Sequence, residues 1–310
     1  MAFISQPRRL RLVALLWLLH TALAGAQVFR VATFNIENYL EAPSATRPAK
    51  SPAAQARVRE CILAIKPDVI ALEEVGSTNA LFALQAALKS AGLDLPHWDQ
   101  VAGYDTNIHL SVLSRFPIIA RRPHTNESFL LDGRRLQVSR GFAEMDIQVN
   151  SKYKFTLIAA HLKSRRPSAI ADEEEWRYEE AVALRRVIDA RLDNDPGQNL
   201  IVLGDFNDVK DSKPLRVIMG RGRVRLFDTR PAERNGDDPA AAGKGHESRN
   251  ITWTHYYDKE DTYSRIDYIL LSHGMEREWL PAETYVLSSP DWGVASDHRP
   301  VVAGFVAEDK

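Results

Sequence analysis

Several short apolar runs in this 310-residue sequence end in side chains that can bind a hard cation or transfer a proton. These side chains are Asn35, Glu74, His161, Asp205, Asn207, Asp267, Asp297 and His298. If the runs are buried strands, their ends are rigid, and oxygen ligands gathered there form a site for a hard cation. Mg²⁺ fits this chemistry, with Mn²⁺ or Ca²⁺ as alternatives, and no pair of His or Cys residues has the spacing of a zinc site.

Asp205 and Asn207 form a pair with a specific chemical use. They are two residues apart, so on an extended backbone both side chains point to the same face. The carboxylate can orient or deprotonate a water molecule, and the amide can donate to a phosphate oxygen as negative charge builds there. This combination suits phosphoryl transfer. The alternative interpretation is an Asp-rich turn that follows a strand.

Two histidines are further candidates. His161 is followed by three basic residues, Lys163, Arg165 and Arg166. A lone histidine at a strand end is usually structural, but the basic cluster favours a position that faces phosphate. His298 lies beside Asp297, so the two suit a proton-transfer group and a metal ligand, or are merely turn residues. The carboxylate of Asp267 is suited to fix the tautomer and orientation of an imidazole.

The elements that must position these residues are predicted from apolar runs and helical spacing. We expect helices at 52–65, 79–90 and 173–192, and strands at 28–36, 69–72, 109–113, 140–149, 154–161, 200–203, 266–271 and 300–306. A stretch at 230–250, rich in Gly, Ala, Asp and Arg, is predicted to be a surface loop. No repeat and no linker between separate cores is evident, so we predict one α+β domain over residues 27–310.

Residues 1–26 have the pattern of a cleaved signal peptide. Arg8, Arg9 and Arg11 precede an apolar run that ends in small residues. The run is shorter than a bilayer span, so no permanent membrane anchor is expected, and we predict a periplasmic or extracellular protein. Without these three Arg, the formal charge of −1 becomes −4, so a polyanionic substrate must meet a local basic patch. The single cysteine, Cys61, excludes an intramolecular disulfide and lies in a rhythm typical of a buried helix face.

Six segments of the sequence carry a resemblance to a known family. They are TFNIEN at 33–38, IALEEV at 70–75, AHLKS at 160–164, GDFND at 204–208, SRIDYIL at 264–270 and SDHRP at 296–300. Together, and in this order, they resemble the endonuclease/exonuclease/phosphatase superfamily, which has the DNase I-like fold. The resemblance covers nearly all of residues 27–310. It implies a four-layer α/β/β/α sandwich of two mixed sheets, with the active site at one end.

The resemblance also implies a role for each candidate residue. Glu74 is the main metal carboxylate, with Asn35 and Asp297 nearby. Asp205 orients the attacking water, Asn207 contacts the scissile phosphate, and His161 binds or protonates it. His298 is the general base or acid and pairs with Asp267.

The sequence departs from the family pattern at two places. The family often has Gln before the metal glutamate, where this sequence has Glu73, so we expect a more negative site. The glutamate that pairs with the first histidine in pancreatic-type deoxyribonucleases has no clear counterpart near residues 107–113. We therefore expect His161 to be held differently.

The fold does not decide the substrate, because the superfamily cleaves DNA, RNA, phosphoinositides and sphingomyelin. A phosphate-tracking surface beside the site is predicted from six basic residues, Arg134, Arg135, Arg140, Lys163, Arg165 and Arg166. The alternative is a solvated surface with ion pairs to the many acids. Three of the six, Lys163, Arg165 and Arg140, are the candidate phosphate contacts. The sequence shows no exposed aromatic hairpin of the kind that a phospholipase at a lipid surface would use.

An exported, monomeric phosphodiesterase that acts on nucleic acid is the first functional hypothesis, most specifically an endonuclease on DNA or RNA. Export argues against an intracellular repair enzyme. The second hypothesis is a phosphoesterase that acts on lipid headgroups or small phosphates. The third is a non-catalytic binding module, which is expected to have lost ligands, whereas every expected position is occupied here.

Overall fold

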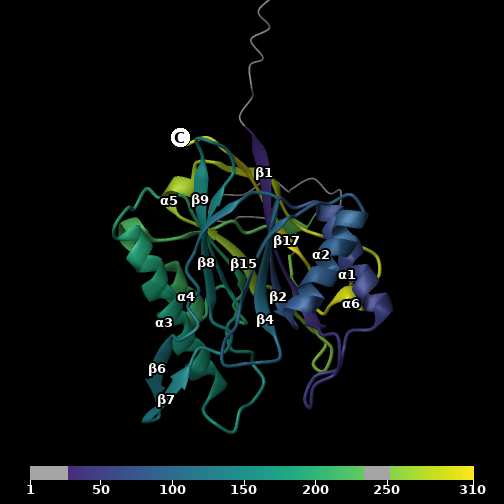
Figure 1. The fold of residues 1–310 in the computed structure, drawn as a ribbon. Helices are drawn as coiled ribbons and strands as arrows, with labels where there is room; N and C mark the ends of the chain where they lie inside the picture. Colours follow the sequence, from purple (N-terminus) through teal and green to yellow (C-terminus); the bar gives the residue numbers. More distant parts are fainter. Residues whose placement is uncertain (1–26, 234–251) are drawn as a thin grey trace, which may run out of the picture.

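Two β-sheets lie face to face in the computed structural model, which describes residues 27–233 and 252–310 (Figure 1). One sheet has seven strands in the order β12-β16-β17-β1-β2-β4-β3, and the other has six in the order β11-β15-β10-β9-β8-β5. The first comprises β12 (Ala232–Glu233), β16 (Trp279–Val286), β17 (Val301–Val306), β1 (Val28–Tyr39), β2 (Val69–Val75), β4 (His109–Ser114) and β3 (His97–Val101). The second comprises β11 (Phe227–Asp228), β15 (Asp267–Leu271), β10 (Leu200–Asp205), β9 (Lys154–Ala160), β8 (Phe142–Gln148) and β5 (Ile118–Arg121).

Helices cover the outer face of each sheet, α1 and α2 on one side and α3 and α4 on the other (Figure 1). These are α1 (Pro52–Ile65), α2 (Thr78–Ser90), α3 (Glu173–Leu192) and α4 (Lys213–Met219). Short helices α5 (His273–Glu276) and α6 (Trp292–Ala295), the 3₁₀ turn Gly222–Val224, and two hairpins complete the described chain. The hairpins are β6 (Ser128–Leu131) with β7 (Arg134–Gln137), and β13 (His255–Tyr257) with β14 (Thr262–Ser264). The predicted α/β/β/α sandwich is confirmed.

Alternation along the central strands produces three apolar layers. In β1, Phe29 and Val31 point into the core between the sheets, whereas Ala32 and Phe34 point toward α1 and α2. The strands of the other sheet do the same toward α3 and α4. Both faces of a central strand are therefore buried, which explains why these strands are continuous apolar runs in the sequence.

Local signals set the ends of the predicted helices. The hydroxyl of Ser51 accepts from the N–H of Ala54 and caps α1, and Lys66 ends it in a left-handed conformation. Asp172 caps α3 in the same way as Ser51, through the N–H of Glu175. The helices predicted at 52–65 and 173–192 have these bounds in the structure, and α2 begins one residue before the prediction.

Strand direction brings the polar residues to one edge of the sandwich. Strands β1 and β2 are parallel to each other, as are β9 and β10, while β15 and β17 run antiparallel to β10 and β1. The carboxyl ends of the first four strands thus meet the beginnings of the last two. In this arrangement Asp205 pairs with Asp267 in register.

Some expectations differ from the structure or lie outside it. Strand β8 begins at Phe142, not residue 140, because Gly141 turns the chain with φ of 66°. The predicted signal peptide and residues 234–250 of the predicted loop lie outside the described residues, and the single domain over 27–310 stays a prediction. Across the described ranges, the helices are all too short or too polar to traverse a bilayer.

Candidate active site

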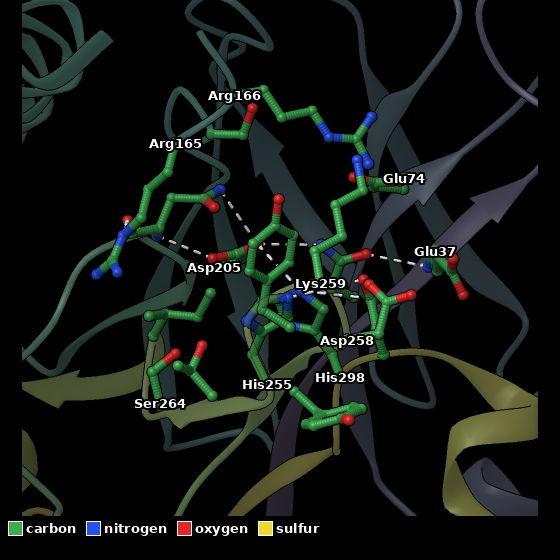
Figure 2. Close-up of a pocket in the computed structure, with 18 of the residues that line it drawn as sticks. Glu37, Glu74, Arg165, Arg166, Asp205, His255, Asp258, Lys259, Ser264 and His298 are labelled. Atoms are coloured by element: carbon green, nitrogen blue, oxygen red, sulfur yellow. Dashed lines mark hydrogen bonds and ion pairs between the residues drawn. The ribbon is translucent and has the colours of Figure 1, made fainter.

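A pocket opens at the edge where the two sheets end, and most predicted site residues line it. The lining includes Asn35, Glu74, Arg140, His161, Arg165, Asp205, Asn207, Asp297 and His298. Asp267 lies directly behind His298, and Lys163 is not among the lining residues. Figure 2 shows Asp205, His255 and His298 near the centre, with Arg165 and Arg166 on one side and Glu37 and Glu74 on another.

His298 is held in one orientation by Asp267. Its Nδ1 lies 2.9 Å from Oδ2 and 3.1 Å from Oδ1 of Asp267, and its Nε2 lies 3.7 Å from Oδ2 of Asp205. Burial disfavours the imidazolium, but the negative charges of Asp267 and Asp205 outweigh it and raise the pKa of His298 well above its ordinary value. The geometry is that of a proton-transfer histidine with a fixed tautomer.

Asp205 joins the two sheets through hydrogen bonds. Its Oδ2 accepts from Nδ2 of Asn35 at 3.0 Å and from Nδ2 of Asn207 at 3.2 Å, and it lies 3.4 Å from Nε2 of His161. Burial raises the pKa of Asp205 to about 6, although the nearby His298 opposes this shift. A carboxylate with this pKa is ionised at neutral pH and is a competent proton acceptor.

Asn207 reaches Asp205 by a route that the sequence did not predict. Strand β10 ends at Asp205, and Asn207 has a left-handed φ of 54°, so the two side chains do not share one face of an extended strand. They converge because the N–H of Asn207 donates to Oδ1 of Asp205 at 2.8 Å, as in an Asx-turn. Its amide also donates to the carbonyl of Leu162 at 3.0 Å, so Asn207 holds Asp205 in place.

His161 is buried and neutral. Burial, reinforced by the positive charge of Arg140, lowers the pKa of His161 well below its ordinary value. Its carboxylate neighbour is Asp205, which fits the expectation that His161 is held differently from its counterpart in pancreatic-type enzymes. A neutral imidazole donates a hydrogen bond but carries no proton to release at pH 7.

Glu74 projects into the pocket from a bulge in β2. The register between β2 and β4 shifts between Leu72 and Val75, and Glu74 has a left-handed φ of 64°. Its Oε2 accepts from the N–H of Asn38 at 2.9 Å and lies 3.6 Å from a guanidinium nitrogen of Arg47. These contacts fix the carboxylate on the pocket wall.

Glu73 does not make the site more negative, as its charge alone would suggest. Its side chain is fully buried, and its Oε1 accepts from the hydroxyl of Thr33 at 2.7 Å. Burial raises the pKa of Glu73 well above its ordinary value and so opposes its ionisation. Glu73 is also not among the residues that line the pocket, so both observations count against the expected extra negative charge.

Backbone strain is concentrated at this pocket. Five non-glycine residues that line it have left-handed φ angles, namely Glu37, Asn38, Glu74, Asn207 and Asp291. A non-glycine residue in this conformation costs about 1 kcal/mol or more, and it persists where the surroundings impose it. Such strain is typical of residues that are held for a function.

Asp297 pairs with a histidine that the sequence did not single out. Nε2 of His255 lies 3.7 Å from Oδ2 of Asp297, and the His255 ring lies 4.5 Å from the His298 ring. Burial alone would raise the pKa of Asp297, but the hydrogen bond with His255 and the charge of His298 lower it to about 2. The sequence signal for His255 was weak, a lone histidine nine residues before the segment that begins at Ser264.

The basic residues divide into two groups. Arg140 and Arg165 line the pocket, as does Arg166. Lys163 is not a pocket residue, because its ammonium donates to the carbonyls of Ser164 and Arg166 in its own loop. Arg134 and Arg135 lie on β7 and are not among the residues that line the pocket. Arg47 was missed by the sequence analysis and is brought in by tertiary contacts with Glu74 and Asp105.

An aromatic hairpin borders the pocket, contrary to the sequence interpretation. Strands β13 and β14 pair with Tyr256 opposite Tyr263, and the pocket lining includes Tyr256, Tyr257, Tyr263 and Trp292. Tyr257 and Tyr263 are exposed. Alternating aromatic residues on two three-residue strands give too short a pattern to recognise without the pairing.

The oxygen donors present fit a hard divalent cation. Asn35, Glu74 and Asp297 supply amide and carboxylate oxygens on one pocket, and Asp205 and Asp267 add two buried carboxylates. Two sets of potential ligand atoms lie within 4.8 Å of one another, one from Asp205, Asp267 and His298 and one from His255, Asp297 and His298. A divalent metal fits, and its identity as Mg²⁺ stays a prediction.

This fold and this site define a metal-dependent phosphoesterase or nuclease. The chain belongs to the endonuclease/exonuclease/phosphatase family, whose profile matches residues 32–298. The resemblance first seen in six short segments is thus confirmed. Comparison with curated protein sequences gave no match.

Solved structures share the fold at low sequence identity. TDP2 of Caenorhabditis elegans, in truncated form, is 15% identical with a TM-score of 0.60 over 90% of this chain and 98% of that one. The human Nocturnin catalytic domain with bound sulfate is 18% identical, with a TM-score of 0.61 over 91% and 95%. An endonuclease/exonuclease/phosphatase protein of Bacteroides vulgatus is 16% identical, with a TM-score of 0.58 over 91% and 100%. At these identities the likeness establishes the fold alone.

Proposed function

We propose that this protein is an exported, magnesium-dependent nuclease that hydrolyses phosphodiester bonds in DNA or RNA. The observation that carries the proposal is the buried array of Asp267, His298 and Asp205 at the floor of a pocket that has arginines on its wall. Proton-transfer groups and phosphate-binding groups are then both within one pocket. Nucleic acid carries several phosphates in a row, and a pocket wall with several arginines can contact more than one of them.

In the proposed mechanism, the charge states of Asp205, His298 and His161 decide which group accepts a proton and which donates one. Asp205 is ionised at neutral pH, so it orients the attacking water and accepts its proton. His298 is an imidazolium held by Asp267, so its Nε2–H stabilises negative charge on the phosphate and protonates the leaving oxygen. Neutral His161 donates a hydrogen bond to a phosphate oxygen, and Asn207 keeps Asp205 in position. The cation, with Glu74, Asn35 and Asp297 as its ligands, would neutralise phosphate charge.

The arginines on the wall give the phosphate a defined approach. The side chain of Arg165 is half exposed, and its guanidinium reaches the carbonyl of Asn207 and the carboxylate of Asp208. Arg140 is buried, donates to the carbonyl of Leu162, and has an Nε without a hydrogen-bond partner among the described residues. A buried unpaired donor on the pocket wall suits a phosphate oxygen.

Export and a monomeric state belong to the proposal on sequence grounds. Three arginines, an apolar run and small residues occupy 1–26 in the order of a signal peptide. The rest of the chain carries a net negative formal charge, so we expect nucleic acid to bind at the pocket and not over the whole protein surface.

A nicking assay on exported protein tests both parts of the proposal. The full chain, expressed in a bacterial host, should reach the periplasm or medium, and this fraction should nick supercoiled plasmid with Mg²⁺ or Mn²⁺. EDTA should abolish nicking. Glu74→Ala and His298→Ala should each lower the rate by about 10²-fold or more with unchanged thermal stability. Glu60→Ala, on the exposed surface of α1, is the matched control and should keep full activity.

A lipid-headgroup phosphodiesterase is the second candidate, favoured by the aromatic hairpin beside the pocket. The same preparations should therefore be offered sphingomyelin vesicles. Intact plasmid together with released phosphocholine would refute the nuclease proposal and support this candidate. Plasmid nicked equally by Glu74→Ala and wild type would show that a contaminant is responsible.

A further inference from the structure

Aromatic side chains on both faces of the hairpin and on α6 line the pocket, and we call these four residues the stacking surface: Tyr256, Tyr257, Tyr263 and Trp292. The rings of Tyr256 and Tyr263 lie 4.7 Å apart across the hairpin, and Trp292 of α6 lies 6.2 Å from Tyr256. Beneath them, Trp253 contacts Tyr263 at 4.9 Å and Trp292 at 4.7 Å. The surface is thus built from the hairpin and α6 together.

The stacking surface is anchored to the catalytic segment. The N–H of Tyr256 donates to the carbonyl of Asp297 at 3.0 Å, and the N–H of Arg299 donates to the carbonyl of Thr254 at 2.7 Å. The guanidinium of Arg299, which is buried, lies 4.1 Å from the centre of the Trp253 ring. The hairpin therefore holds a fixed position relative to His298, and its rings are ordered before any ligand arrives.

Two rings of this surface are exposed, and one of them, Tyr257, is connected to the catalytic group. Tyr257 is 36% exposed and Tyr263 is 56% exposed. The ring of Tyr257 is stacked with that of His255 at 6.4 Å and 23°, and His255 contacts His298 at 4.5 Å. A continuous series of rings thus leads from the catalytic histidine to the open side of the pocket.

The two sides of the pocket differ in chemistry. In Figure 2, Arg165 lies at the left and Arg166 at the top, whereas His255 and Ser264 of the hairpin lie lower, and Lys259 of the hairpin tip extends upward between them. A phosphate held at the floor near His298 would have cations on one side and aromatic faces on the other. A nucleotide has the same division, with charged phosphates along the backbone and a flat base to one side.

The hairpin tip argues against a lipid surface as the occupant. Its four tip residues are all charged and exposed, namely Asp258, Lys259, Glu260 and Asp261. Insertion of these groups below the headgroups is costly, and their net negative charge is repelled by anionic lipid. The same charge repels phosphates from the hairpin, so it directs the backbone to the arginine side and the base to the rings.

We propose that the stacking surface binds an unpaired nucleobase next to the scissile phosphate, on the ring of Tyr257 beside His255, and that nucleic acid with single-stranded character is the preferred substrate class. A base within a duplex has both faces covered by its neighbours, so only an unpaired or extruded base offers a face to these rings. This inference rests on the proposed nuclease function and specifies its substrate.

Binding measurements with a matched pair of oligomers test the inference. His298→Ala protein with Mg²⁺ is titrated into fluorescent oligothymidylate of about 12 nucleotides and into an abasic oligomer of equal length. The oligothymidylate should bind about 10-fold or more tightly than the abasic oligomer. Introducing Tyr257→Ala should remove most of this difference, while Tyr257→Phe should keep it. Phe82→Ala changes a ring of similar exposure on α2 and is the control.

Cleavage provides the second readout. Wild type should cut single-stranded DNA faster than the same sequence as a duplex, and Tyr257→Ala should reduce this preference. Equal affinity for the two oligomers would overturn the inference. It would also be overturned if Tyr257→Ala lost binding to neutral lipid vesicles but kept its binding to oligothymidylate. Base-dependent binding without cleavage of any nucleic acid would refute the nuclease proposal while supporting the stacking surface.

Discussion

His161 and His298 are both almost completely buried in one pocket, yet their surroundings give them opposite charge states. His298 has Asp267 within hydrogen-bond distance and Asp205 nearby, so its pKa is raised. His161 shares Asp205, but its burial, reinforced by the positive charge of Arg140, lowers its pKa. Two identical side chains can therefore supply an imidazolium and a neutral donor in the same reaction.

The neutral state of His161 leads to a prediction about its replacements. Glutamine also donates a neutral hydrogen bond, so His161→Gln should retain at least about 10% of the wild-type rate, whereas His161→Ala should lose about 10²-fold. The pH profile of His161→Gln should match that of wild type, because no proton on His161 is released. Steady-state rates from about pH 5 to pH 9 check this. A profile that loses its basic limb in His161→Gln would show that His161 acts as an acid.

At the scale of elements, the site depends on how closely β10 approaches β9. Gly204 has φ of 133°, a conformation that other residues rarely adopt, and a Cβ added there would lie 1.9 Å from the carbonyl oxygen of Ala160. This close approach places Asp205 beside His161, the residue that follows Ala160. The small residue before Asp205 is therefore part of the geometry of the site.

Gly204→Ala should consequently damage both stability and activity. The new methyl group forces the ends of β9 and β10 apart, so we expect a loss of about 3 kcal/mol or more in the free energy of unfolding. Urea denaturation followed by circular dichroism measures this loss, and the folded fraction should still lack nicking activity. Gly197→Ala, where the nearest atom lies 3.5 Å from the added Cβ, is the control and should change neither quantity. A stable and active Gly204→Ala would mean that the strands separate without cost.

At the scale of the whole molecule, a second buried acid lies in the region of α5, away from the pocket-lining residues. Glu278 is buried, and its carboxyl accepts a hydrogen bond from the hydroxyl of Tyr153. Burial raises the pKa of Glu278 to about 7, from an ordinary value of 4.5. Because the folded protein binds this proton more tightly than the unfolded chain, the stability contributed is present below about pH 4.5 and is lost as the pH rises through 7.

Glu278→Gln should remove this pH dependence. Glutamine mimics the protonated acid, so the variant should have a higher Tm than wild type near pH 8 by a few degrees, about 2–4 °C per kcal/mol, and a similar Tm near pH 5. Thermal denaturation at both pH values gives the comparison, and Glu308→Gln, which changes an exposed glutamate, serves as control. An equal fall in Tm with pH in Glu278→Gln and wild type would assign the pH dependence to other groups.

The sequence by itself determined the layers of the molecule and most of the pocket. Apolar runs predicted the central strands because both of their faces are buried, and the local caps at Ser51 and Asp172 set the starts of α1 and α3. Polar residues at strand ends predicted the side chains that meet at one edge. These features depend on neighbours along the chain, which a sequence shows directly.

Only the tertiary structure decided which charges meet and which surfaces are open. His255 joins Asp297 through a pairing 42 residues apart in the sequence, Lys163 folds back on its own loop, and burial raises the pKa of Glu73. The aromatic hairpin likewise exists only once its two short strands pair and dock beside His298. The physical reason is the same throughout: electrostatic shifts and exposed surfaces depend on distances in space between residues far apart in the chain.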